Sequence, residues 1–94
     1  MTRWLKGALI LPDRVVPNGL LACENGKITG VWDLEADAGA PAVPDGAEVV
    51  DRGYIAPGYI DIHVHGGGGG DFMDGDPEAV VAITTCHARH GTTG

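Results

Sequence analysis

The chain has few basic residues, few aromatic residues and no long apolar run, and these shortages exclude several classes of function. Six Lys and Arg residues stand against 13 Asp and Glu, so the formal net charge is -7. Proteins bind nucleic acid and anionic membranes through basic patches, and neither is therefore expected as a partner. No stretch approaches the roughly 20 apolar residues that a membrane-spanning helix needs.

The sequence also lacks the features of an exported protein. The N-terminal apolar run, Ala8–Leu11, is too short for a signal peptide, and Pro12 and Asp13 interrupt it. The only cysteines, Cys23 and Cys86, lie far apart without a Cys-x-x-Cys spacing. This favours free thiols in a reducing compartment over a disulfide or a zinc finger. We therefore expect a cytoplasmic protein.

Glycine and proline are abundant instead, with 16 and 6 residues in a chain of 94. They predict many turns around one modest core. The first half of the chain favours strands, and extended segments are expected over residues 4–11, 15–16, 20–24, 27–32 and 47–51. Asn25-Gly26 is the strongest hairpin signal, because both central turn residues need positive φ. Pro17–Gly19 is expected to interrupt the second strand, and residues 33–46 to form a surface loop.

The last third predicts a strand, a glycine loop and a helix. Residues 60–65 form an apolar strand candidate that begins after a Pro-Gly turn. Asp76 suits an N-cap, Pro77 the first helical position and Gly91 the residue after the helix, which predicts a helix over residues 77–90. This order is the first half of a βαβ unit, in which a parallel strand should follow the helix. Since the sequence shows no such strand, we expect the beginning of a larger protein.

The alternation of a strand divides residues 60–65 into an apolar and an ionisable face. The apolar residues are expected to pack on the following helix, and they are Ile60, Ile62 and Val64. The other face carries Asp61, His63 and His65. Two histidines at i and i+2 lie about 6.5–7 Å apart at the backbone, and their rings can converge on one metal ion, because Zn–N bonds are about 2.0–2.1 Å long.

Neutral imidazole suits zinc, iron and nickel, and Asp61 could accept a ring N–H and fix the tautomer of a ligand. A His-x-His pattern alone is a weak signal, and a strand that faces water could produce it. Its position at the C-terminal end of a strand before a helix strengthens it, because α/β folds place their active sites there. A complete metal site would need further ligands from elsewhere.

Five consecutive glycines, Gly66–Gly70, follow the second histidine. Such a run is often a flexible tether, but a position between a strand and a helix is unsuited to a domain linker. We interpret these glycines as a substrate loop whose backbone can approach a ligand closely. The phosphate-loop pattern G-x-x-x-x-G-K-[ST] is absent.

Three weaker candidates have simpler structural explanations. His87 and His90 could bind a metal, but a solvated helix end is the favoured interpretation. The cysteines have no neighbouring base and are expected to pack rather than react. Acidic residues surround the start of the helix without the EF-hand spacing, and capping accounts for the last of them; they are Asp71, Asp74 and Asp76.

The segment APGYIDIHVHG resembles the amidohydrolase superfamily, in which a Pro-Gly turn leads into a first barrel strand ending in His-x-His. The continuation HVHGGGGGDFMDGDPEAV, followed by HARHGTTG, is similar to N-acetylglucosamine-6-phosphate deacetylases. The resemblance is strongest over residues 56–94. It implies an α/β fold, with residues 1–56 forming part of a small β-sandwich domain and residues 57–94 the first strand, loop and helix of a (β/α)₈ barrel.

The resemblance further implies metal-assisted hydrolysis of N-acetylglucosamine 6-phosphate to glucosamine 6-phosphate and acetate, by a homodimer. His63 and His65 match the metal ligands of the first strand, for one or two divalent ions, zinc or iron. The remaining ligands, the catalytic Asp and the phosphate-binding residues would lie beyond Gly94. We therefore expect no catalytic residue within these 94 residues and no activity from them alone.

Two other functions remain open. One is a different amidohydrolase, a cyclic amidase or deaminase, against which the glycine run argues. The other is a stand-alone β-rich binding or structural module without catalysis, which the short length favours and the unpaired strand–helix unit disfavours.

Overall fold

The computed structural model describes all residues 1–94, which divide into two compact units, Met1–Pro57 and Gly58–Gly94. Most of its regular secondary structure is strand, and there is one α-helix. The first unit contains the strands β1 (Thr2–Ile10), β2 (Val15–Glu24), β3 (Lys27–Asp33) and β4 (Glu48–Val49). The second contains β5 (Gly66–Gly67), β6 (Gly70–Asp71), the 3₁₀ turn η1 (Phe72–Asp74) and helix α1 (Pro77–Arg89). None of the helices has the length and apolar character needed to cross a membrane.

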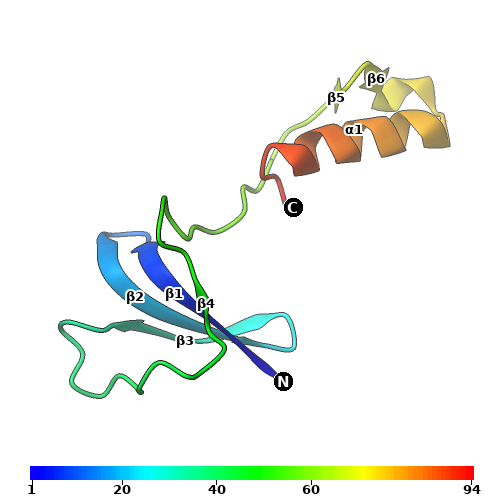
Figure 1. Ribbon diagram of the computed structural model, residues 1–94. Coiled ribbons are helices and arrows are strands. Elements are labelled where there is room, and N and C mark those ends of the chain that lie inside the picture. Colours follow the sequence, from blue (N-terminus) through cyan, green and yellow to red (C-terminus); the bar gives the residue numbers. More distant parts are fainter. The chain divides into compact units, whose positions relative to one another are not determined.

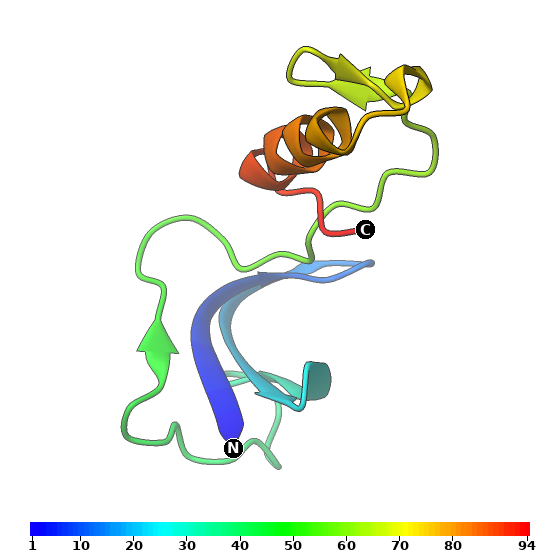
Figure 2. The same ribbon diagram turned by 90° about the vertical axis from the view of Figure 1, so that its right-hand side faces the viewer.

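The first unit is a sheet of four strands in the order β3-β2-β1-β4. β1 to β3 run antiparallel, β4 is parallel to β1, and Ile55 extends this edge by a bridge to Leu9. β1 and β2 are the longest strands and bend together (Figures 1 and 2). The predicted hairpin at Asn25-Gly26 is confirmed, with φ of 51° and 75°, both in the left-handed region that such a turn requires.

The predicted interruption at Pro17–Gly19 is wrong, because β2 continues through it. The pairs Gly7–Gly19 and Leu9–Val16 leave Ala8 opposite both Pro17 and Asn18. This extra residue on one strand is a β-bulge, and a bulge accommodates a proline because it leaves a residue outside the ladder. The Asn18 carbonyl is used instead by the Leu34 N–H, at 2.9 Å.

The other strand predictions hold with shifted ends. β1 begins at Thr2 rather than at residue 4, and the strand expected over 47–51 is reduced to β4. The expected loop after β3 is confirmed, and Asp33 closes its start by accepting the N–H groups of Glu35 and Ala36. Both cysteines are free, as predicted.

The core of the first unit is formed by side chains of β1 and β2. Four apolar side chains are buried there: Leu9, Val16, Leu20 and Ala22. Trp4 and Trp32 stack with ring centroids 5.9 Å apart, an arrangement that adds to the stabilisation from buried area.

An exposed ion pair joins β1 to β4. Arg3 Nε and Nη2 donate to the two carboxylate oxygens of Glu48, both at 2.9 Å. These hydrogen bonds hold the pKa of the Glu48 carboxyl below its ordinary value, and they contribute more than the charge attraction to Arg3 does. They also raise the pKa of Arg3.

The pair predicts a small, acid-sensitive contribution to stability. Because the pKa of Glu48 is lower in the folded state, the pair stabilises the fold at pH values above the unfolded pKa of about 4.3. The contribution disappears as the pH falls through the lower folded pKa. We therefore expect Glu48→Gln to lower the urea midpoint slightly at pH 7 and by less as the pH falls toward 3, with Glu24→Gln as the control. A difference that stays constant down to pH 3 would contradict this account.

The second unit contains the predicted helix, and its ends are those that the sequence indicates. Asp76 is the N-cap and accepts the Glu78 N–H at 2.9 Å, Pro77 is the first helical residue, and His90 is the C-cap. Gly91 follows with φ of 93°, a left-handed conformation that ends helices. Ile83 is the buried residue of this helix.

Two predictions about the flanks of the helix are wrong. Residues 60–65 form no strand, and a parallel partner after the helix does begin. The hydrogen bonds are all between backbone groups, each 2.8 Å long. The Tyr59 N–H donates to the Gly91 carbonyl, the Thr93 N–H donates to the Tyr59 carbonyl, and the Asp61 N–H donates to the Gly94 carbonyl. The partner was not recognisable because Gly-Thr-Thr-Gly has no apolar pattern. Beyond Asp61 the extended segment has no neighbour in the chain to pair with.

Candidate metal-binding site

The segment between Asp61 and His65 is held by contacts other than a sheet ladder. The Asp61 carboxylate accepts the backbone N–H of His63 at 3.0 Å. The His65 carbonyl accepts the N–H of Phe72 at 2.9 Å. The Asp61 carboxylate thus accepts a hydrogen bond from the backbone of His63, whereas the sequence suggested that it would accept one from the ring of a metal ligand.

The two histidine side chains converge. Their Nε2 atoms lie 2.9 Å apart, and the rings meet edge to face with centroids at 4.8 Å. Since one nitrogen must donate to the other, one ring carries its proton on Nε2 in this arrangement. A metal ion would need both Nε2 atoms free of protons.

The pair fits two ligand positions of one ion. Bonds of about 2.0–2.1 Å from each nitrogen can reach a common point when the nitrogens are 2.9 Å apart. However, His63 and His65 belong to no cluster of three or more His, Cys, Asp or Glu side chains that could hold a metal. The pair alone is therefore too small for a zinc site, because a protein-bound zinc normally has at least three protein ligands.

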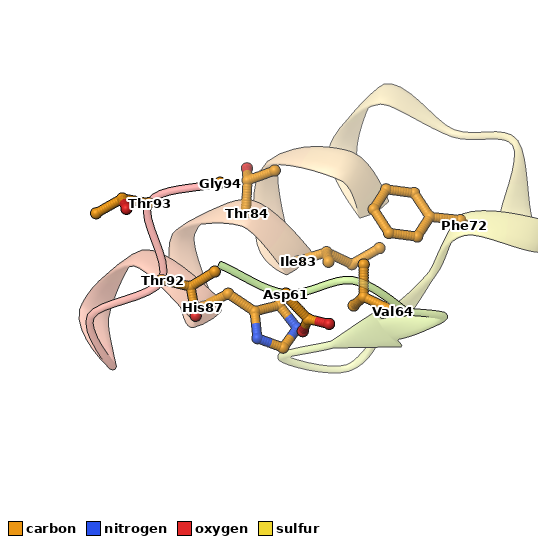
Figure 3. Close-up of a pocket in the computed structure, with 9 residues that line it drawn as sticks. All are labelled: Asp61, Val64, Phe72, Ile83, Thr84, His87, Thr92, Thr93 and Gly94. Carbon is orange, nitrogen blue, oxygen red and sulfur yellow. The ribbon is translucent and has the colours of Figure 1, made fainter. Parts of the chain in front are cut away.

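The expected division of residues 60–65 into two faces holds only in part. Asp61 and Val64 line the same pocket of about 270 Å³, together with Ile83 and His87 of α1 (Figure 3). The two isoleucines do not pack on the helix, since Ile60 is 76% and Ile62 95% exposed. Strict alternation requires regular pairing, and this segment has none after Asp61.

The five glycines form a hairpin against the helix. β5 and β6 pair antiparallel, and the turn between them consists of Gly68 and Gly69, with φ of 58° and 88°. A Cβ on Gly68 would lie 2.9 Å from the Ala82 carbonyl oxygen, and one on Gly70 would lie 3.0 Å from that of Ala79. The glycine run is therefore explained by the close approach of the hairpin to α1 (Figure 2). Its contact with a substrate stays a prediction.

The two turn glycines provide a matched test of this packing. Both have positive φ, so alanine at either costs about 1–2 kcal/mol of backbone strain. Only at Gly68 does the added methyl group also meet the helix backbone, since nothing lies within 4 Å at Gly69. We expect Gly68→Ala to lower the thermal midpoint of the helix signal more than Gly69→Ala. Equal shifts would show that the hairpin is not packed as described.

His87 is the residue that sequence reasoning misjudged. It is half-buried rather than solvated, and its Nε2 lies 3.0 Å from the Gly66 carbonyl oxygen. His90 is exposed and its Nδ1 bonds to the Cys86 carbonyl within its own helix. The sequence correctly placed both histidines near the helix end, but it did not indicate which ring turns toward the hairpin.

The acidic residues before the helix act as caps. Asp71 accepts the Met73 N–H at 2.8 Å, and Asp74 accepts the Asp71 N–H at 3.1 Å, a reciprocal capping box around η1. Asp76 caps α1 as predicted. Each carboxylate is thus engaged by backbone N–H groups.

Two curated proteins resemble the chain in sequence. The N-acetylglucosamine-6-phosphate deacetylase of Bacillus subtilis is 31% identical over 94 residues, which cover 92% of this chain and 21% of that protein. The N-acetylgalactosamine-6-phosphate deacetylase of Escherichia coli is 44% identical over 41 residues, 44% of this chain and 11% of that protein. No protein-family model matches the chain.

Solved structures give the same result. The N-acetyl-D-glucosamine-6-phosphate deacetylase of Mycobacterium smegmatis superposes with a TM-score of 0.69 at 28% identity, covering 97% of this chain and 23% of that one. A variant of it in complex with N-acetyl-D-glucosamine-6-phosphate gives a TM-score of 0.70 at 26% identity, with 98% and 23% coverage. The resemblance inferred from the sequence motifs is confirmed: in sequence and in fold, these 94 residues are similar to about a fifth of an N-acetylglucosamine-6-phosphate deacetylase.

Proposed function

We propose that the chain contributes the first metal ligands of a deacetylase that hydrolyses the acetamide of N-acetylglucosamine 6-phosphate. The observation that carries this proposal is the 2.9 Å approach of the His63 and His65 Nε2 atoms, within a chain similar to such enzymes. A bound divalent ion, zinc or iron, would supply Lewis acidity toward the acetyl carbonyl and an activated water. His63 and His65 would hold it, and Asp61 would keep the His63 backbone in place.

The proposal includes a larger architecture. The parallel hydrogen bonds between Tyr59–Asp61 and Gly91–Gly94 support a barrel that begins here, with residues 57–94 as its first strand, loop and helix. The open sheet of residues 1–56 would belong to a β-sandwich. A homodimer belongs to the proposal on the strength of the resemblance alone. The two free cysteines agree with a cytoplasmic location, where thiols stay reduced.

The experiment compares the chain alone with a chimera. The 94 residues replace the matched segment of the Bacillus subtilis enzyme, and release of acetate from N-acetylglucosamine 6-phosphate is measured with added Zn²⁺ or Fe²⁺. We expect turnover by the chimera and none by the chain alone, because the chain carries too few ligands. Substantial turnover by the chain, or a chimera that is folded by circular dichroism yet inactive, would contradict the proposal.

A second substrate has specific support. The relative that is 44% identical over 41 residues is named for N-acetylgalactosamine 6-phosphate, which differs from the glucosamine sugar only in configuration at C4. The same assay run with both sugars distinguishes them by the ratio of their kcat/KM values. A larger kcat/KM for the galactosamine sugar would reassign the substrate and keep the reaction.

A further inference from the structure

We propose that His87 is a positioning residue for the histidine pair. Its ring holds the carbonyl of Gly66, the residue after His65, and so determines where the His65 side chain is presented. The inference rests on the proposed function, because it assigns His87 a role toward the ligands that function requires.

The ring of His87 is fixed between the helix and the hairpin. It comes from the last turn of α1 and reaches Gly66, 21 residues away in sequence, with an Nε2–O distance of 3.0 Å. A carbonyl oxygen only accepts, so Nε2 carries the proton and donates it. A Cβ on Gly67 would lie 2.8 Å from the same nitrogen, so the ring lies directly against β5.

The contact matters because the histidine pair has little other support. Both rings are exposed, and the backbone between Asp61 and Gly66 has no sheet partner. Asp61 fixes the His63 N–H, whereas Phe72 and His87 fix the two successive carbonyls of His65 and Gly66. Without the His87 ring, the Gly66 carbonyl loses its partner on the helix. The approach of the His63 and His65 rings is then opposed by the rotamer entropy of two exposed side chains.

His90 provides a matched control on the same helix end. It is also a histidine near the C-terminus of α1, but it is exposed and its Nδ1 donates to Cys86 at 2.8 Å within the helix. Loss of His90 therefore removes a histidine and a local hydrogen bond without touching the hairpin. Glutamine at position 87 is the conservative variant, because its side-chain amide can donate from nearly the position of Nε2.

The test uses ¹⁵N relaxation and imidazole spectra of the 94-residue chain with the variants His87→Ala, His87→Gln and His90→Ala. We expect an Nε2–H tautomer for His87 in the wild type. We expect His87→Ala to lower the order parameters of the His65 and Gly67 amides from near 0.85 toward about 0.6. His90→Ala should leave them unchanged, and His87→Gln should restore them. Zn²⁺ binding should weaken by about tenfold in His87→Ala, the lower range for partners that orient ligands.

Unchanged amide order in a His87→Ala variant would overturn the inference. If that variant loses its helix by circular dichroism, His87→Gln decides instead: retained order supports the role, and lost order in a helical protein refutes it. Failure of the proposed function would look different. Equal Zn²⁺ binding by the wild type and by a variant without His63 and His65 would refute ligation, while the amide order would still report on His87.

Discussion

Replacing both His63 and His65 by alanine should abolish specific Zn²⁺ binding by the chain. Their Nε2 atoms form the only convergent pair of histidine ring nitrogens in the structure, and with two ligands even the wild type should bind weakly. Loss of a residue that merely orients a ligand costs roughly 10–100-fold in metal affinity, so loss of both ligands should exceed about 100-fold. Isothermal titration of Zn²⁺ into the wild type and the double variant measures this.

Controls separate ligation from adventitious binding. His90→Ala removes an exposed histidine on the helix end and should bind Zn²⁺ like the wild type. Each single variant at the pair should bind more weakly than the wild type, since one imidazole remains. Equal heats from the double variant and the wild type would remove the metal site from this chain.

Leu20→Ala should have the largest effect on stability. Leu20 is 0% exposed, at the centre of β2, and truncation of a buried leucine costs about 2–5 kcal/mol through lost burial and the cavity left behind. A unit of 57 residues has a free energy of unfolding of roughly 3–9 kcal/mol. The substitution should therefore remove much of it, and urea unfolding followed by tryptophan fluorescence, with the Trp4–Trp32 stack in this unit, measures the loss.

Ile28→Ala is the matched control. Ile28 lies on the neighbouring strand β3 but is 62% exposed, so its truncation removes little buried area and should cost well under about 1 kcal/mol. Similar midpoints for the two variants would show that the core of the sheet does not lie where the structure places it.

The elements that could be predicted are those whose causes are local. Asn25-Gly26 specifies its own turn because both residues tolerate positive φ. Asp76, Pro77 and Gly91 specify the ends of the helix through caps that act within one turn. The proximity of His63 and His65 could be predicted for the same reason, because residues two positions apart in sequence lie close together in any fold.

The elements that were missed depend on distant partners. Whether residues 60–65 form a strand depends on a partner strand that pairs with them. Their own apolar alternation does not indicate whether such a partner is present. The bulge at Pro17 depends on Ala8 of another strand. The burial of His87 depends on a hairpin that begins 21 residues earlier. None of these relations has a signature within a short window of sequence.

The glycine hairpin has a consequence for how the neighbouring sequence can vary. It presents bare backbone to α1, so the fit of the two surfaces depends on the helix side, where the Cβ atoms of Ala79 and Cys86 face Gly70 and Gly68. A larger residue at position 79 or 86 could not be offset by a smaller residue on the hairpin, because glycine has no side chain to shorten. Sequence freedom on this face of the helix is therefore one-sided: the small residues must stay small for as long as the glycines remain opposite them.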